Sequence, residues 1–234
     1  MPAGERNGRK AGQLARADNS TVLRVASADN HASPKVACDS YGGLRRAVHL
    51  VRRAPSMLIC NMRTPAGLVN GARGTVVAVV LKNQTPDKDL DGAVSAASVK
   101  YVVVDMPKYC GPVFFPEHPK WVPIEPATMK HNRFKGWERR QLPLVLAWGI
   151  TIHKSQGLTF EGPVLVDFAH QPTYQPVSSP GLAFVGMSRT TDWENQAFRN
   201  VPDYWEFRKM LQNPLFKWRT RLEECLDKLH DATA

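Results

Sequence analysis

The sequence lacks any long apolar run, and this absence limits the kind of protein that it encodes. No stretch of its 234 residues approaches the ~20 consecutive apolar side chains that a membrane-spanning helix needs. The first residues have no apolar segment of the kind that a signal peptide requires. Cysteine is scarce as well: its four copies are widely spaced, with no CxxC pair and no Cys/His pairing at metal-ligand spacing. We therefore expect an intracellular chain with reduced thiols and no metal site.

Positive charge is what the sequence has in excess. It contains 31 Lys and Arg against 21 Asp and Glu, for a formal net charge of +10. Hydrophobic residues make up 43% and charged residues 22%, which is typical of a folded chain with one large or two small domains. A basic balance of this size favours polyanionic partners, nucleic acid first and an anionic membrane surface second.

Residues 142–161 combine an apolar run, LPLVLAWGI, with a polar and basic segment, TIHKSQG. A nearly continuous apolar run that leads to a polar turn at Gly157 predicts a buried parallel strand over residues 142–150 and a functional loop after it. In open α/β sheets, loops at the carboxyl ends of strands hold the ligand. This loop offers backbone N–H groups, a hydroxyl, an imidazole and an ammonium, which suit phosphate oxygens. The alternative is a buried strand with an ordinary solvated turn.

Short β-branched segments separated by turn signals lie before this stretch. Strands are expected over residues 21–25, 56–60, 75–81 and 99–105, with shorter candidates over 112–115 and 121–124. The dipeptide Asn70-Gly71 is a strong signal for a tight turn. The pattern predicts a small antiparallel β-barrel over residues 72–135, inserted into a domain of another type.

The segments after residue 161 have an α/β pattern. They predict a parallel-type strand over 163–168, a loop over 169–180 and a short helix over 181–190 that presents Ser188 and Arg189 at its end. Two further helices are expected over residues 202–213 and 214–230.

Three basic segments precede the apolar run, and two of them allow more than one interpretation. The first 20 residues are small, polar and basic, and are expected to be poorly ordered. The apolar residues of segment 44–53 recur at helical spacing, and the arginines beside them form either a solvated face or a phosphate-facing stripe. Residues 129–141 interleave Phe134 and Trp137 with Lys and Arg, as in a groove for single-stranded nucleic acid. The alternative is a linker whose aromatic side chains anchor it to the core.

Two motifs in order resemble those of a known enzyme group. HKSQG at residues 153–157 and GLAFVGMSR at residues 181–189 resemble motifs V and VI of superfamily 1 DNA helicases, in particular the Pif/RecD-type group that moves 5′ to 3′ on DNA. GLVNGARGTV at residues 67–76 resembles the segment before the SH3-like insertion of that group. The resemblance covers roughly residues 40–191. It implies an α/β fold in which a RecA-like parallel sheet with helices is interrupted by a small SH3-like antiparallel β-barrel.

This resemblance predicts five parts along the chain. They are a poorly ordered basic leader (1–20), the first part of a RecA-like domain (21–71), the SH3-like insertion (72–135), the second part of the RecA-like domain with motifs V and VI (136–202) and C-terminal helices (203–234).

The resemblance also implies roles for individual residues. In such enzymes two RecA-like domains clamp ATP between them and move single-stranded DNA, and this chain looks like the second domain. Arg189 would be the catalytic arginine that reaches the γ-phosphate, a task that suits a planar guanidinium. Gly157 and Gln156 would contact the nucleotide, the glycine because it lacks an obstructing Cβ. The DNA backbone would be bound by Thr151, His153, Lys154, Ser155, Thr159, Asn61 and Asn70.

Two motifs of the helicase family have no counterpart in the sequence. It contains neither GxxxxGK[ST] nor an acidic Asp-Glu pair at the end of an apolar strand, so it lacks the phosphate cradle and the Mg²⁺ carboxylate. We therefore expect the C-terminal half of an ATP-dependent 5′-to-3′ DNA helicase, which uses ATP and Mg²⁺ only together with a first RecA-like domain and binds neither alone. Its expected partners are single-stranded DNA and that domain, with no membrane and no stable oligomer.

Two alternatives come from other functional classes. One is a catalytically inactive nucleic-acid-binding or regulatory remnant of such a helicase, and the other is an interaction domain whose SH3-like insertion is the working part. For a eukaryotic protein, the resemblance implies the nucleus or the mitochondrion, and a link to DNA repair, recombination or telomere maintenance.

Overall fold

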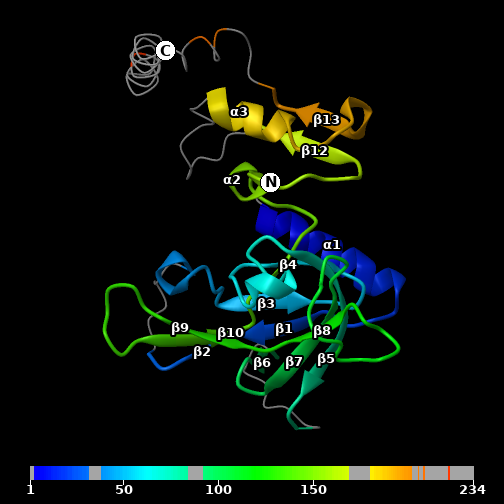
Figure 1. Cartoon of the computed structure of the whole chain (residues 1–234). Coiled ribbons are helices and arrows are strands. Elements are labelled where there is room, and N and C mark those ends of the chain that lie inside the picture. The colour runs from blue at the N-terminus through cyan, green and yellow to red at the C-terminus, as the bar shows by residue number, and fades with distance from the viewer. Residues whose placement is uncertain are drawn as a thin grey trace, which may run out of the picture. The chain divides into compact units, whose positions relative to one another are not determined.

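The structure is a computed structural model that describes residues 3–31, 38–83, 92–168 and 180–201, together with Trp205, Arg208 and Arg221. The chain divides into two compact units, an N-terminal unit over Ala3–Gly149 and a C-terminal unit that begins at Ile150 (Figure 1). The loop expected over 169–180 and the two helices expected after residue 201 lie almost entirely outside the described residues. No described helix is long and apolar enough to cross a membrane.

The N-terminal unit consists mainly of short strands. Its helices and strands are α1 (Ala3–Ala17), β1 (Leu23–Ala26), β2 (Ala28–Asp29), η1 (Cys38–Tyr41), β3 (Ala47–Leu50), β4 (Pro55–Leu58), η2 (Thr64–Ala66), β5 (Arg73–Leu81), β6 (Val94–Ser95), β7 (Val99–Asp105), β8 (Trp121–Ile124), β9 (Ala127–Lys130), β10 (Glu138–Gln141) and β11 (Leu144–Leu146). They form a five-stranded sheet in the order β11-β4-β5-β7-β8, and two three-stranded sheets in the orders β3-β1-β6 and β2-β10-β9. The five-stranded sheet is antiparallel throughout.

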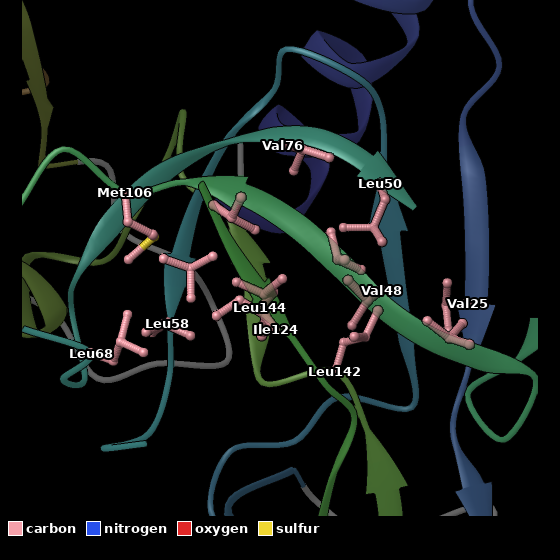
Figure 2. Close-up of a cluster of buried hydrophobic side chains, with 14 of the residues drawn as sticks. Val25, Val48, Leu50, Leu58, Leu68, Val76, Met106, Ile124, Leu142 and Leu144 are labelled. Carbon is pink, nitrogen blue, oxygen red and sulfur yellow. The ribbon is translucent and has the colours of Figure 1, made fainter. Parts of the chain in front are cut away.

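The main core of this unit is built from residues of the five-stranded sheet and of the β3-β1-β6 sheet. Val76 on β5, Val102 and Val104 on β7 and Ile124 on β8 are fully buried, because every second side chain of a strand faces the same side of its sheet. Figure 2 shows how the strands bring side chains from distant segments together in this cluster. At Gly74 an added Cβ would lie 2.5 Å from the carbonyl oxygen of Asp105, so the pairing of β5 with β7 requires glycine there.

The strands predicted over 75–81, 99–105 and 121–124 are confirmed as β5, β7 and β8. Their β-branched composition and alternation identify them without tertiary information. The strand predicted over 112–115 is wrong, because these residues form a loop between β7 and β8 in which Val113 and Phe114 are exposed.

The parallel strand predicted over 142–150 is also wrong. Only Leu144–Leu146 form a strand, and β11 pairs with β4 in antiparallel register, Val145 opposite Met57. All residues from Leu142 to Ala147 are buried. A continuous apolar run indicates that both faces of a strand are covered, but it does not indicate whether the neighbouring strands are parallel or antiparallel.

The five-stranded sheet extends beyond the insertion expected over 72–135. Its strands β4 and β11 lie on either side of that range and pair with each other, while β4 also pairs with β5. Among the described residues, the chain passes from one unit to the other at Gly149–Ile150, within the apolar-to-polar stretch 142–161.

The leader expected to be poorly ordered contains the helix α1. Ala11 and Ala15 on one face of α1 pack with Val51, Ala54 and Leu146. The buried face of α1 consists mostly of small alanine side chains, so the composition of the segment resembles that of a flexible leader. Ala, Arg and Lys nevertheless all favour the helical conformation.

A single buried side chain, Asn7, bonds α1 to the end of the apolar run. Its Nδ2 donates to the carbonyl oxygens of Leu146 and Gly149 at 2.8 and 2.9 Å, and its Oδ1 accepts from the backbone N–H of Gly149 at 2.8 Å. The amide is thereby satisfied on both ends, as a buried polar group requires.

The helix predicted over 44–53 is wrong as well. Val48 and Leu50 are buried on either side of the exposed His49, which is the period of a strand, and β3 pairs antiparallel with β1. Leu44 and Val51 are buried next to the ends of β3, so the helical spacing of the apolar residues is a coincidence of strand and flanking loops.

The C-terminal unit contains α2 (Ile152–Ser155), β12 (Val164–Asp167), α3 (Pro180–Met187), η3 (Trp193–Asn195) and β13 (Gln196–Arg199). The parallel strand predicted over 163–168 is confirmed, since β12 pairs in parallel with β13. Val166 and Phe168 form a small core with Ala183 of α3. The helix predicted before Arg189 is confirmed as α3.

Candidate DNA and nucleotide site

The loop between β11 and β12 begins with a capped turn of helix. Thr151 is the N-cap of α2, and its hydroxyl accepts from the backbone N–H of Lys154 at 3.4 Å. A threonine at this position starts the helix at Ile152 because its oxygen satisfies a backbone donor that has no partner in the first turn. His153 and Lys154 therefore lie on the same short helical turn, and both side chains are exposed.

Most of the predicted site residues of this loop are exposed together. Thr151, His153, Lys154, Gln156 and Thr159 all have exposed side chains. Together they present hydroxyl, imidazole, ammonium and amide groups along nine residues of chain, a set that suits contacts to phosphate oxygens without reading of sequence.

Ser155 is the exception among the predicted DNA contacts. Its side chain is buried, and its hydroxyl donates to the carbonyl oxygen of Ile152 at 2.7 Å. In this structure Ser155 therefore stabilises the turn from inside and does not present its hydroxyl to a ligand, which corrects the expectation from the sequence.

Gly157 has the backbone conformation that the motif requires. Its φ of +77° lies in the left-handed region, where other residues are strained. No atom lies within 4 Å of the position that a Cβ would take, so the space beside this glycine is open. Glycine is needed here for the turn itself, and the turn leaves its backbone accessible from that side.

Arg189 follows α3 and points into the loop of motif V. Its Nη1 donates to the carbonyl oxygens of Ser155 and Leu158 at 3.2 and 3.1 Å, its Nε donates to the carbonyl oxygen of Val185, and its Nη2 donates to Ser188 Oγ at 2.6 Å. A guanidinium has five N–H donors, so its bonds to described residues leave one N–H of Nη2.

The backbone joins the two motifs as well. The N–H of Phe160 donates to the carbonyl oxygen of Arg189 at 2.9 Å, and Phe160 forms a parallel bridge with Thr190. The structure therefore brings motifs V and VI, which are separated in sequence, into one site, with Arg189 as the side chain that links them.

Asn61 and Asn70 lie together in the N-terminal unit. Asn61 Oδ1 accepts from the backbone N–H of Asn70 at 2.8 Å and closes the loop before β5. Both residues are exposed, but the bond gives Asn61 a structural part in the turn that the sequence did not reveal. Gly71 follows with a φ of +90°, as the predicted tight turn requires.

The N-terminal unit also carries arginines around His49 on β3. Arg24 lies directly opposite His49 on β1. Partial burial of the ring against the sheet and the charges of Arg24 and Arg45 lower the pKa of His49. Arg45 precedes β3 in irregular structure rather than on the expected helix face, and a phosphate-facing role for the arginines of segment 44–53 is still a prediction.

The basic and aromatic segment 129–141 is a hairpin of β9 and β10. Arg139 is fully buried, and its guanidinium donates to both carboxylate oxygens of Asp29 at 2.7–3.1 Å and to the carbonyl oxygen of Leu44. It also lies 4.4 Å from the ring centre of Tyr41. This cation is structural, and no local sequence signal distinguishes it from its exposed neighbours.

Comparison with known proteins places these observations in a family. No protein-family model matches the sequence. ATP-dependent DNA helicase PIF1 of Xenopus laevis is 29% identical over 198 residues, which cover 79% of this chain and 26% of that protein. PIF1 of Danio rerio is 32% identical over 156 residues, 67% of this chain and 20% of that protein. ATP-dependent DNA helicase PIF7 of Trypanosoma brucei brucei is 34% identical over 154 residues, 62% of this chain and 15% of that protein.

Most of this chain is a Pif1-type superfamily 1 helicase region. The fold agrees with that of solved Pif1 helicases. The helicase from Candida albicans superposes with a TM-score of 0.58 at 24% identity, over 88% of this chain and 45% of that one. A Bacteroides Pif1 helicase in complex with ADP-AlF3 and ssDNA gives 0.54 at 20% identity, over 90% and 43%. The chain thus spans between 15% and 26% of the length of these curated relatives.

Proposed function

We propose that this chain supplies the single-stranded-DNA track and the catalytic arginine of a Pif1-type, ATP-dependent 5′-to-3′ DNA helicase. The observation that carries the proposal is the joining of motifs V and VI through Arg189, in a chain whose relatives are ATP-dependent DNA helicases. The polarity follows from the resemblance of the two motifs to the Pif/RecD-type group.

The DNA track would consist of the exposed residues of the motif V loop. Thr151, His153, Lys154 and Thr159 offer donors without a base-reading arrangement. Such donors hold a strand by its phosphates, so binding tolerates any sequence and weakens with salt. Asn61 and Asn70 would contribute from the N-terminal unit.

The nucleotide side would consist of Gly157, Gln156 and Arg189. The open space beside Gly157 and the exposed amide of Gln156 fit one wall of an ATP site. The phosphate cradle and the carboxylate for Mg²⁺ would come from a first RecA-like domain, because the sequence has no motif for either. ATP bound there supplies the phosphoryl group whose charge Arg189 would stabilise.

The bonds of Arg189 suggest how the two ligands would be coupled. To contact a phosphate with two donors, the guanidinium must give up at least one of its four partners, since one N–H is left. In this proposal it gives up the carbonyl oxygens of the motif V loop rather than the hydroxyl of Ser188. Release of the carbonyl oxygens of Ser155 and Leu158 would then loosen the loop that carries Lys154. In this proposal, binding of ATP thereby changes the affinity of the motif V loop for DNA.

The five-stranded sheet β11-β4-β5-β7-β8 is our candidate for the SH3-like insertion. It is small and antiparallel, as such a barrel must be, and it shares its core with the β3-β1-β6 sheet. The second candidate function is a catalytically inactive nucleic-acid-binding remnant, in which the exposed donors of the motif V loop would hold DNA without hydrolysis of ATP.

The DNA track is tested by the salt dependence of binding. Affinity for oligothymidine is measured by fluorescence anisotropy over a range of salt concentrations, for the unmodified chain and for Lys154→Ala. Loss of one phosphate contact should lower the slope of log affinity against log salt by about 0.7. Lys100→Ala, an exposed lysine on β7, is the matched control and should leave the slope unchanged. An unchanged slope for Lys154→Ala would refute the track.

The nucleotide side is tested by phosphate release from ATP in the presence of single-stranded DNA. We expect no turnover by the chain alone, and turnover when it is joined to a RecA-like domain that carries a P-loop. Turnover by the chain alone would contradict the division of the ATP site. No turnover in the joined protein, with DNA binding retained, would favour the inactive remnant.

A further inference from the structure

The tip of the β9–β10 hairpin carries a cluster of aromatic rings that the motif V site does not use. The ring of Phe134 lies 4.8 Å from that of Trp137 at an interplanar angle of 32°, and His31 stacks on Trp137 at 4.6 Å and 18°. Trp137 is half-buried, whereas Phe134 is 52% exposed. The three rings therefore form a cluster in which Phe134 and His31 are exposed, with Phe134 as the accessible ring among the cations of the hairpin tip. Figure 1 shows the loop of this hairpin at the left end of the N-terminal unit.

The hairpin tip is held in shape by His131 beneath it. The buried His131 accepts two backbone N–H bonds at Nδ1, from Arg133 at 2.9 Å and from Phe134 at 3.0 Å. The ring of His131 also lies 4.8 Å from that of Phe134. Since both the backbone and the ring of Phe134 are fixed in this way, little conformational entropy is lost when a flat ligand packs on it.

The charge of the tip fits a nucleic-acid strand. Residues 130–136, KHNRFKG, contain three cations, Lys130, Arg133 and Lys135, and no acidic residue. All three cations are exposed. The acidic Glu138 lies farther down the hairpin, opposite Lys130 on β9. An exposed aromatic ring between cations is the arrangement by which proteins stack an unpaired base while they hold its phosphates.

We propose that Phe134, supported by Trp137 and positioned by His131, stacks on an unpaired base of single-stranded DNA. This inference rests on the proposed DNA-binding function and adds a contact to bases where the motif V loop contacts phosphates. Every base has a flat face, so the contact tolerates any sequence. It differs from the phosphate track in one measurable property: it needs the bases.

The test uses the full chain and two labelled strands of equal length, oligothymidine and an abasic strand that has phosphates but no bases. Phe134→Leu keeps an exposed apolar side chain but removes the ring. It should weaken binding to oligothymidine by roughly five- to a hundred-fold, the range reported for stacking on a single base, and leave binding to the abasic strand unchanged. Phe134→Trp should restore the affinity for oligothymidine.

The matched control is Phe114→Leu, which alters a similarly exposed phenylalanine (49%) in the loop between β7 and β8 and should affect neither strand. An unchanged affinity of Phe134→Leu for oligothymidine, or an equal loss on both strands, would overturn the stacking contact. Lys154→Ala distinguishes the two proposals: if it lowers the salt slope while Phe134→Leu has no effect, the track stands and only the stacking contact fails.

Discussion

Two arginines of this chain use most of their hydrogen-bond donors inside the protein. Arg139 bonds to the carboxylate of Asp29 and to a carbonyl oxygen, and Arg189 bonds to three carbonyl oxygens and a hydroxyl. The rigid fork of a guanidinium makes such multiple bonding possible, which a lysine cannot reproduce. Their partners decide their roles: Arg139 has a permanent countercharge, whereas the charge of Arg189 faces only neutral groups among its described bonding partners.

This difference predicts the effect of Arg189→Lys in the absence of nucleotide. The bonds to the carbonyl oxygens of Ser155 and Leu158 should be lost, at about 1 kcal/mol each, and amide exchange over residues 151–158 should become roughly 30-fold faster. Hydrogen exchange with mass spectrometry measures this. Arg199→Lys, at an exposed arginine of the same unit, should leave that exchange unchanged. Unaltered exchange in Arg189→Lys would show that the arginine does not stabilise the loop.

At the scale of secondary-structure elements, the β9–β10 hairpin depends on one buried ion pair. Arg139 of β10 bonds to Asp29 of β2, its neighbour in the three-stranded sheet, while Tyr41 covers its guanidinium. The side chain of Asp29 is only 14% exposed. Removal of one partner of such a pair leaves the other charge desolvated, which is why the loss is larger than that of a surface ion pair.

We therefore expect Arg139→Ala to lower the free energy of unfolding by about 3–5 kcal/mol. Arg133→Ala, at an exposed arginine of the same hairpin, should change it by less than ~0.5 kcal/mol. Chemical denaturation followed by circular dichroism compares the two. A loss below ~1 kcal/mol for Arg139→Ala would mean that the pair does not hold the hairpin to β2.

At the scale of the whole molecule, each hydrophobic cluster of the described residues lies within one of the two units. The clusters around Leu58 and Leu146 draw only on residues before Ile150, and the cluster around Val166 draws only on residues after it. The motif V loop starts at the point where the chain passes from one unit to the other. The bond between Asn7 and Gly149 at its start therefore belongs to the N-terminal unit, and the candidate site residues that follow belong to the C-terminal unit.

This division predicts the behaviour of a chain that ends at Gly149. Because both larger core clusters remain complete, it should unfold cooperatively, with a midpoint within about 4 °C of the corresponding transition of the whole chain, the shift that ~1 kcal/mol produces. Differential scanning calorimetry measures both transitions. Loss of a cooperative transition in the shortened chain would contradict the independence of the N-terminal unit.

Local patterns were sufficient for much of this protein. The β-branched composition of residues 75–81 and 99–105 predicts β5 and β7, because side-chain shape is a local property. The motifs at 153–157 and 181–189 indicate the helicase family and the residues of the candidate site, because each motif fixes a local turn or helix end. The sequence by itself therefore determined the strands β5, β7 and β8, the helicase family and the composition of the candidate site.

Only the tertiary structure decided where these parts meet. The apolar run 142–147 is buried in either strand direction, and its antiparallel pairing with β4 depends on contacts across 80 residues and more of chain. The burial of Arg139 depends on Asp29. The hydrogen bonds of Arg189 to Ser155 and Leu158 depend on how α3 packs against β12. Such pairings join residues that are distant in sequence, and no local pattern encodes them. Composition predicted the cations, and tertiary contacts separated Arg139, which is buried against a carboxylate, from Arg189, which joins motifs V and VI.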